Sequence, residues 1–286
     1  MEQIKCPICD SDSSNHFLSL KDRLEVSNET ISLVECDCNF IYLNPRPNEK
    51  EIYTYYKNEN YDPHNKVNFL YKSIQKFSFI WKASIIKKIS QKKNISILDY
   101  GAGKGEFASF FKKKNNNCHI DIYEPILNNF NLNNDIQVFS NHSDIKLKYN
   151  IITFWHSLEH IHNLNEVFSL IQKHLISDGY LFIAVPNLDA VEKKYFNKNW
   201  APYDAPRHLY HFNYESMKKI LNKHNFKIVN YKTLYQDSIY NIFLSLKTMS
   251  FSNTIKLFYY SIISILKILF INKKISSSIL YICKRK

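Results

Sequence analysis

The first stretch whose residue types could do chemistry reads ILDYGAGKGEF. Three of the four glycines in the chain, Gly101, Gly103 and Gly105, lie close together there, so the backbone must turn tightly or admit a ligand at close range. Asp99 precedes this turn and Glu106 closes it. A dinucleotide site needs G-x-G-x-x-G and offers bare N–H groups to a pyrophosphate, whereas two carboxylates favour a ligand that carries positive charge.

S-adenosylmethionine (SAM) is such a ligand, because it carries an ammonium and a sulfonium group. A β-branched apolar run precedes Asp99, and a helical apolar spacing follows the turn, which predicts a strand–turn–helix unit. Glu124 ends the next predicted strand, roughly 20 residues beyond the turn, where a doubly wound fold binds ribose hydroxyls. An ordinary strand-end carboxylate is the alternative. Asp144, in the loop after a third strand, is predicted to face the adenine.

Histidines in two later stretches could take a proton from a substrate. His156, Glu159 and His160 follow the predicted fourth strand, at the edge of the sheet where open α/β folds bind ligands. His208 lies in KYFNKNWAPYDAPRHLYHFN, a long segment whose aromatic residues argue against disorder. Because histidine accepts a proton near neutral pH, we predict His208 as the general base, with His156 second and His160 third. A purely structural histidine is the alternative.

Two pairs of cysteines lie in the first 40 residues. Cys6 and Cys9 have the favoured C-x-x-C spacing, whereas Cys36 and Cys38 are one residue closer. Four thiolates satisfy tetrahedral zinc, and a small segment without a large core gains folding energy from such a site. We predict a structural zinc site, with buried free thiols as the alternative. The N-terminus lacks the basic and apolar regions of a secretory signal, so we expect a cytoplasmic protein, in which disulfides are rare.

Strand-like and helix-like runs alternate from residue 95 onward. The expected strands are 95–98, 119–123, 136–139, 149–155, 180–185, 226–234 and 279–283; helices are expected at 67–89, from 107, from 163 or 165 to 175, and at 213–224. This alternation predicts a mainly parallel sheet with helices on both faces. In the preceding linker, Tyr55, Tyr56 and Tyr61 either line a ligand cleft or lie on the surface of a hinge.

The C-terminal part of the chain is apolar and basic. The net charge is +12, and no acidic residue follows Asp237. The apolar run 255–271 is shorter than the roughly 20 residues that span a bilayer. On a helix, Lys256, Lys267 and Lys274 project within about 20° of one another, which suits a helix in an anionic membrane interface. Packing on the protein or on a second subunit is the alternative. The tail lacks the interleaved aromatic residues of a single-strand binder, so we do not expect nucleic acid.

The motifs together resemble the class I SAM-dependent methyltransferases, specifically the bacterial subgroup with a cysteine-rich N-terminal ribbon. The matches are CPIC with CDCNFIYLNPRP, ILDYGAGKGEF, YEP, FWHSLEHIHN, DGYLFIAVPN and DAPRHLYHFN, which cover almost the whole chain. The resemblance implies an α/β, Rossmann-like fold with a seven-stranded, mainly parallel sheet, an antiparallel last strand and an apolar helical insertion before it. It also implies that Asp99, Gly101 and Gly103 hold the methionine part of SAM and that Glu124 binds the ribose.

The resemblance divides the chain into four parts. These are a zinc-ribbon-like segment (1–47), a linker with N-terminal helices (48–90), a SAM-binding core (91–237), and the apolar, basic helical insertion with the last strand (238–286). Two departures stand out: Asn150 replaces a usual Asp, and C-x-C replaces C-x-x-C-G. Quinone-type O-methyltransferases have E-x-x-E-H with a divalent metal after the fourth strand. Here the pattern is H-x-x-E-H, so a metal there is a minor alternative.

Methyl transfer from SAM is an in-line displacement, so the enzyme mainly aligns the acceptor and removes its proton. Asp204 or Arg207 would orient the base or hold an acidic group of the acceptor. We expect O-methylation of a sugar, a glycan intermediate or a lipid-linked acceptor, with peripheral attachment to the inner face of the membrane as an option. One alternative is a quinone or small-aromatic O-methyltransferase. Another is a non-catalytic zinc-ribbon protein with a degenerate methyltransferase fold, against which the intact Asp99 and Glu124 argue.

Overall fold

The computed structural model describes residues 1–286 except 57–68, 91–93, 127–131, 133–134, 247 and 249, and of residues 69–74 it describes the backbone alone. Its larger sheet has seven strands in the order β10 (Phe226–Thr233), β11 (Ser278–Arg285), β8 (Leu175–Pro186), β7 (Tyr149–Trp155), β4 (Ser96–Tyr100), β5 (His119–Tyr123) and β6 (Val138–Phe139). The strands from β8 to β6 are parallel, and β11 is antiparallel to both β10 and β8. The predicted Rossmann-like α/β fold with an antiparallel last strand is therefore confirmed.

The central strands are mostly apolar, because both faces of the sheet are covered. Ile97 pairs with Ile151, and both belong to one core cluster; the next pair, Leu98 and Ile152, belongs to the other. All four side chains are fully buried, and each such burial contributes about 1.5–3 kcal/mol. The alternation along one strand thus supplies two cores, one on each face.

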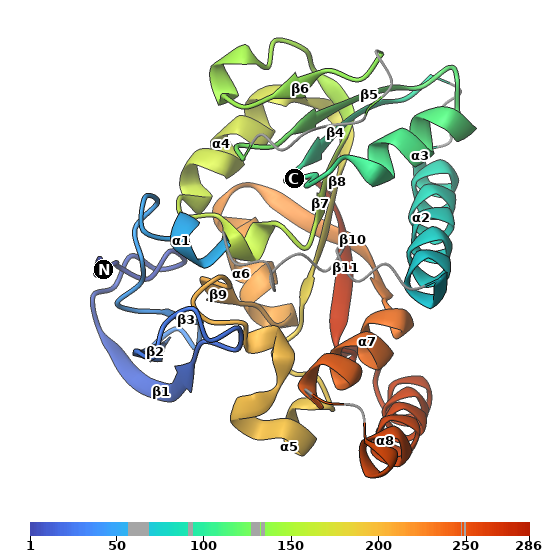
Figure 1. Ribbon diagram of the computed structural model, residues 1–286. Helices are drawn as coiled ribbons and strands as arrows, with labels where there is room; N and C mark the ends of the chain where they lie inside the picture. Colours follow the sequence, from blue (N-terminus) through green and yellow to red (C-terminus); the bar gives the residue numbers. More distant parts are fainter. Residues whose placement is uncertain (57–68, 91–93, 127–131, 133–134, 247, 249) are drawn as a thin grey trace.

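Helices cover the two faces (Figure 1). On one face α2 (Phe69–Ser90) and α3 (Glu106–Lys114) contribute to the core cluster that contains Ile97, and on the other α4 (Leu164–His174) and α6 (Tyr214–Lys223) contribute to the cluster that contains Leu98. The side chain of Asn163 caps α4, and a capping box that Asn213 and Ser216 form begins α6. Short helices α1 (Tyr53–Tyr56) and α5 (Lys193–Phe196) lie in connecting segments.

A second, four-stranded sheet combines the N-terminus with a distant segment. Its order is β1 (Ser14–Lys21), β2 (Thr30–Cys36), β3 (Ile41–Leu43) and β9 (Tyr210–His211). The β9 strand comes from the long aromatic segment after β8 and pairs antiparallel with β3. Phe40 packs against Phe212 with ring centroids 5.4 Å apart. The N-terminal strands are therefore joined to the segment that carries His208.

The element boundaries differ from the sequence expectations in places. The β8 strand begins at Leu175, not at residue 180. Gly179 permits this, because a Cβ there would lie 3.0 Å from the Asn150 carbonyl oxygen of β7. The β6 strand has only two residues, and α8 (Phe251–Phe270) begins four residues early because the Ser250 side chain caps it. The expected start of α2 at Val67, and Tyr61, lie outside the described residues.

Candidate functional site

The glycine turn connects β4 to α3 with three residues in the left-handed region: Gly101 has φ +70°, Gly103 +57° and Gly105 +69°. A Cβ on Gly101 would lie 2.5 Å from Ser157 Cβ, so only glycine lets these backbones approach. Nothing lies within 4 Å of a Cβ built on Gly103. The turn is therefore packed at its first glycine and open at its second.

Two carboxylates that the sequence singled out lie beside this turn. Asp99 is 2% exposed and accepts a 2.6 Å hydrogen bond from the Thr153 hydroxyl. Burial raises the pKa of Asp99 to about 6, against the effects of Thr153 and Lys82, so it is mostly ionised at pH 7. Glu124 accepts a 2.8 Å hydrogen bond from the Gly103 N–H, and burial raises its pKa as well. The structure thus brings Asp99, Gly101, Gly103 and Glu124 together.

A buried cation also lies near the turn. Lys82 of α2 places Nζ 4.6 Å from the Trp155 ring centroid. Burial lowers the pKa of Lys82, whereas the charges of Asp99 and Asp237 raise it. No sequence motif predicts this lysine, because only packing brings α2 to the turn. Its charge offsets part of the negative potential on which the sequence argument for SAM relied.

Three aromatic side chains, Tyr100, Tyr123 and His142, pack together at the carboxyl ends of β4 and β5. His142 Nε2 lies 2.7 Å from the Tyr100 hydroxyl, and the ring centroids of His142 and Tyr123 are 4.6 Å apart. Asp144 follows in the same 3-10 turn, and its carboxylate is exposed, 3.5 Å from the Asn141 side chain. Sequence reasoning chose Asp144 and missed His142. The sequence signal that could have pointed to this group is an aromatic residue at the end of each of the strands β4, β5 and β6, namely Tyr100, Tyr123 and Phe139.

His156, directly after β7, is held between two carboxylates. Its Nε2 lies 2.9 Å from Asp237 Oδ2 and its Nδ1 lies 3.6 Å from Glu159 Oε1. Burial lowers the pKa of His156, but the charges and hydrogen bonds of Asp237 and Glu159 outweigh it and raise the pKa to about 9. At pH 7 His156 is an imidazolium, which has no lone pair to accept a proton. Asp237, the last acidic residue of the chain, comes from α7 (Tyr235–Ser245) and was not predicted to contribute.

Glu159, His160 and His208 form a second cluster, whose ligand atoms lie within 4.8 Å of one another. His160 Nδ1 lies 2.9 Å from the Arg207 carbonyl oxygen, and His208 Nδ1 lies 2.8 Å from the Pro202 carbonyl oxygen. A carbonyl oxygen only accepts hydrogen bonds, so Nδ1 is the ring nitrogen that carries the hydrogen in each histidine, and Nε2 is the nitrogen with the lone pair in the neutral form. His160 Nδ1 also lies 3.0 Å from the Tyr56 hydroxyl.

The charges in this cluster favour a neutral imidazole beside a carboxylate. Burial is the main cause that lowers the pKa of His160 to about 4, so His160 is neutral at pH 7. Glu159 is 1% exposed. Burial opposes its ionisation, but the positive charge of His156, whose Nδ1 lies 3.6 Å away, holds the pKa of Glu159 below the ordinary value. The cluster can therefore accept a proton. Its two histidines and one carboxylate, with both Nδ1–H groups on carbonyl oxygens, are also a donor set that binds divalent metals.

The four N-terminal cysteines meet although their spacing departs from the usual pattern. Cys6 Sγ lies 3.6 Å from Cys38 Sγ, and Cys9 Sγ lies 3.4 Å from Cys36 Sγ. All four sulfur atoms are within 4.8 Å of one another, and none is in a disulfide. Four thiols at such distances fit one tetrahedral zinc ion. The turn after β2 lets the C-x-C pair face the C-x-x-C pair.

Comparisons with known proteins agree with this geometry. A family model described as a methyltransferase domain matches residues 74–231, more than half of the chain. The structure of a Burkholderia thailandensis 1,6-didemethyltoxoflavin-N1-methyltransferase, with 1,6-didemethyltoxoflavin and S-adenosylhomocysteine bound, matches at a TM-score of 0.52 and 12% identity, over 90% of this chain and 96% of that one. This likeness shows a shared fold.

Two further solved structures match less well. A coclaurine N-methyltransferase bound to N-methylheliamine and S-adenosylhomocysteine has a TM-score of 0.46 at 14% identity, over 73% of this chain and 71% of that one. A mycolic acid cyclopropane synthase complexed with S-adenosylhomocysteine has a TM-score of 0.45 at 13% identity, over 67% and 78%. The curated proteins give no match. From its family match and its fold, the chain belongs to the methyltransferase-domain family, and its resemblance to the class I SAM-dependent methyltransferases is confirmed.

Proposed function

We propose that the chain is a SAM-dependent methyltransferase that methylates a hydroxyl oxygen. The observation that carries this proposal is the glycine turn, which is open at Gly103 and flanked by the buried carboxylates Asp99 and Glu124. Asp99 and the glycines would hold the methionine part of SAM, and Glu124 would accept hydrogen bonds from the ribose. Structures with the same fold or a similar one have S-adenosylhomocysteine bound, which supports this donor.

Ser157 connects the glycine turn to the cluster of Glu159, His160 and His208. Ser157 contacts Gly101 and donates a 2.7 Å hydrogen bond to the Tyr100 carbonyl oxygen. Glu159 and His160 follow in the 3-10 turn Leu158–His160. An acceptor oxygen beside Nε2 of His208 would therefore lie near the methyl donor. His208 is the proposed base because its Nδ1–H is fixed on Pro202 and its Nε2 lone pair can take the hydroxyl proton during displacement.

A sugar or glycan hydroxyl is the acceptor that we favour over a quinone. The side-chain nitrogens of Trp155 and Gln236, which are sequence neighbours of His156 and Asp237, are buried without a hydrogen-bond partner in the part of the chain that the structure describes. Buried donors of this kind need acceptor atoms, and a polyhydroxylated acceptor supplies more of them than a flat aromatic ring. This preference covers lipid-linked sugars as well.

The outward face of α8 supports attachment to an anionic lipid surface. Ser261, Ser264 and Ile268 face the protein and are buried, while most of the large apolar side chains of α8 are exposed. The exposed residues on this face are Phe251, Ile255, Phe258, Tyr259, Ile262, Leu266, Leu269 and Phe270. By length and composition α8 is the one helix among the described residues that could cross a membrane. Because α7 and the 3-10 turn Lys273–Ile275 contact α8, and the chain continues from that turn into β11 of the sheet, we propose that α8 lies in the interface of the inner membrane face and does not cross the membrane.

The basic stripe expected beside this face is only partly available to lipid. Lys256 is exposed, but Lys267 donates a 3.2 Å hydrogen bond to the Tyr195 hydroxyl and Lys274 lies 3.4 Å from the Tyr214 ring centroid. We expect flotation with anionic vesicles that falls in Phe258→Ser, and no change in Phe77→Ser, a matched substitution at an exposed site on α2. Unchanged flotation of Phe258→Ser would assign α8 to a protein contact.

Calorimetry with SAM, followed by transfer of labelled methyl groups, tests the enzyme proposal. We expect the folded chain to bind SAM and to transfer label into a glycan or lipid-linked fraction of cell extracts. Folded protein that does not bind SAM would favour the non-catalytic zinc-ribbon protein. If label enters only a quinone or small-aromatic fraction, the proposed sugar acceptor is wrong, whereas the assignment as a methyltransferase stands.

A further inference from the structure

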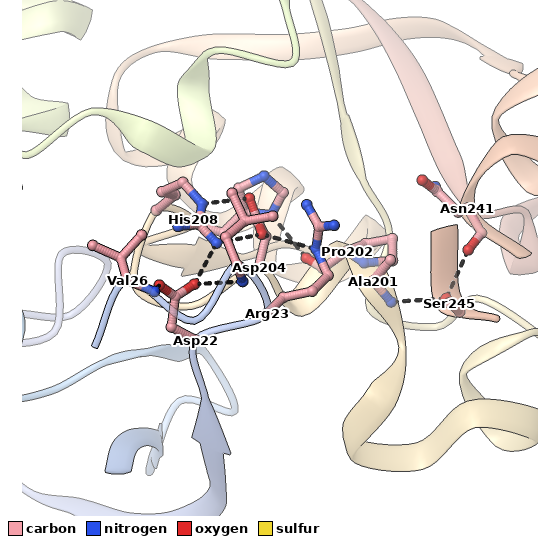
Figure 2. A network of polar contacts seen from close by, with 11 residues as sticks. Asp22, Arg23, Val26, Ala201, Pro202, Asp204, His208, Asn241 and Ser245 are labelled. Atoms are coloured by element: carbon pink, nitrogen blue, oxygen red, sulfur yellow. Dashed lines mark hydrogen bonds and ion pairs between the residues drawn. The ribbon is translucent and has the colours of Figure 1, made fainter. Parts of the chain in front are cut away.

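A buried ionic network connects the N-terminal sheet to the segment that carries His208. Arg207 has no exposed side-chain surface; its Nη2 donates to Asp22 Oδ1 at 2.7 Å and to Asp204 Oδ1 at 2.8 Å, and its Nε donates to Asp204 Oδ2 at 3.0 Å. Arg23 Nε adds a 3.2 Å contact to Asp204. Figure 2 shows Asp22 and Arg23 beside Asp204 and His208. The two positive charges of the arginines equal the two negative charges of Asp22 and Asp204, so the network has no net charge.

This network fixes the backbone on which His208 depends. Asp204 has φ +26°, a conformation that residues other than glycine rarely adopt. Its carbonyl oxygen accepts a 3.1 Å hydrogen bond from the His208 N–H, while Pro202 accepts the Nδ1–H of His208 at 2.8 Å. The ion pairs with Arg207 hold the pKa of Asp204 well below its usual range. Asp204 is therefore a permanent anion that keeps this turn in shape.

The contribution of Asp22 comes from outside the methyltransferase core. Asp22 follows β1, and its two carboxylate oxygens also accept hydrogen bonds from the backbone N–H groups of Leu24 and Val26, at 3.0 and 2.9 Å. It is thus held rigidly before it meets Arg207. On the opposite side of the segment, Ser245 of α7 accepts a 2.8 Å hydrogen bond from the Ala201 N–H (Figure 2). The turn that carries His208 is held between the N-terminal and C-terminal parts of the chain.

We propose that Asp22 is a positioning residue for His208: through Arg207 and Asp204 it sets the Nδ1–H tautomer and the direction of Nε2. This inference rests on the proposed function, in which His208 Nε2 takes the acceptor proton. In this proposal the N-terminal segment that carries the four cysteines contributes to the geometry of the acceptor site. Loss of Asp22 leaves a buried guanidinium with one partner fewer, and such a group draws its neighbours into a new arrangement.

The test is nitrogen-15 NMR of the full chain labelled at histidine, with S-adenosylhomocysteine present. Long-range spectra distinguish Nδ1–H from Nε2–H, and His208→Gln identifies the signal. We expect wild-type His208 to be in the Nδ1–H form and Asp22→Asn to shift it toward a mixture with Nε2–H, with a loss of methyl transfer of about tenfold or more and unchanged SAM affinity. The control is Asp10→Asn, which breaks an exposed 2.9 Å ion pair between the same N-terminal segment and Lys223.

The outcomes separate this inference from the proposed function. A folded Asp22→Asn chain with the wild-type His208 tautomer would overturn the positioning role, whether or not SAM binds. Failure of the wild-type chain to bind SAM would overturn the function and leave the tautomer result readable. If Asp22→Asn does not fold, Arg23→Gln removes the outer contact at a site whose side chain is 28% exposed, and it must shift the tautomer in the same direction, though less.

Discussion

The proposed donor half and acceptor half of the site are built in opposite ways. The donor half, Asp99 to Glu124, is one continuous strand–turn–helix–strand unit. The acceptor half takes Glu159 from the end of β7, His208 from the long aromatic segment, Asp237 from α7 and its support from Asp22 beyond β1. A continuous unit can be found from local spacing. A site assembled from four distant segments depends on packing that no local pattern encodes.

The largest expected effect tests how strictly the donor half depends on its glycines. Gly101→Ala places a Cβ 2.5 Å from Ser157 Cβ and in a left-handed conformation; such strain alone costs about 1–3 kcal/mol. We expect loss of SAM binding in calorimetry and a lower melting temperature. Gly103→Ala is the matched control, because it has the same sign of φ and nothing within 4 Å, so it should keep the fold. SAM affinity at the wild-type level in Gly101→Ala would show that the turn does not form the donor site.

The same contrast explains what could be predicted from the sequence. Asp99 could be proposed from the sequence because it precedes the glycine turn, and Glu124 because it follows a parallel strand, whose end lies at an edge that topology fixes. His160 was proposed for the same reason as Glu124. Asp22, Lys82 and Asp237 were missed, because their partners lie far away in the sequence and only packing brings them to the site.

The misplaced expectations have the same cause. His156 was predicted as a candidate base, but α7 places Asp237 Oδ2 2.9 Å from its Nε2, and the raised pKa makes His156 an imidazolium at pH 7. Lys267 was predicted to face lipid, but it donates a hydrogen bond to the Tyr195 hydroxyl, which belongs to the segment after β8. Periodicity gives the direction of a side chain around its own helix, but the neighbour that it meets there is a tertiary property.

The next largest effect concerns the acceptor half. His208→Gln keeps a polar side chain and removes the basic lone pair, so we expect transfer of labelled methyl to fall by about 10²–10⁴-fold, with SAM affinity unchanged. His16→Gln, at an exposed site on β1, is the control. Unchanged methyl transfer in His208→Gln would mean that another residue of the acceptor half is the base. A loss of SAM affinity as large as the loss of methyl transfer would mean that the two halves do not act independently.

A metal count sharpens the comparison further, because among the residues that the structure describes each half of the chain has one group of candidate ligands. We expect about one zinc per chain in elemental analysis, lost together with stability of the N-terminal sheet in Cys6→Ser and retained in Glu159→Gln. A second equivalent that remains in Cys6→Ser and disappears in Glu159→Gln would make Glu159, His160 and His208 a metal site, with no base among them. Metal-free wild-type protein of full stability would remove zinc from the N-terminal segment.

The smallest effect is a pH dependence that decides between His156 and His208. The pKa of His156 is raised to about 9 in the folded chain, against about 6.5 unfolded. A raised folded pKa stabilises the protein fully below pH 6.5, and this contribution is lost as the pH rises through 9. The free energy of unfolding of wild type, minus that of Asp237→Asn, should therefore shrink between pH 6.5 and 9. Because the His156 side chain is 36% exposed, solvent screens the pair and the change is modest.

The control for this experiment is Asp10→Asn, because it breaks an ion pair with Lys223 that contains no histidine. A difference curve for Asp237→Asn that is flat with pH would mean that His156 is a neutral imidazole in the folded chain. Its Nε2–H would then donate to Asp237, and its lone pair would lie on Nδ1, on the side of Glu159. The slope of this curve thus shows whether His156 competes with His208 for the role of base within the acceptor half.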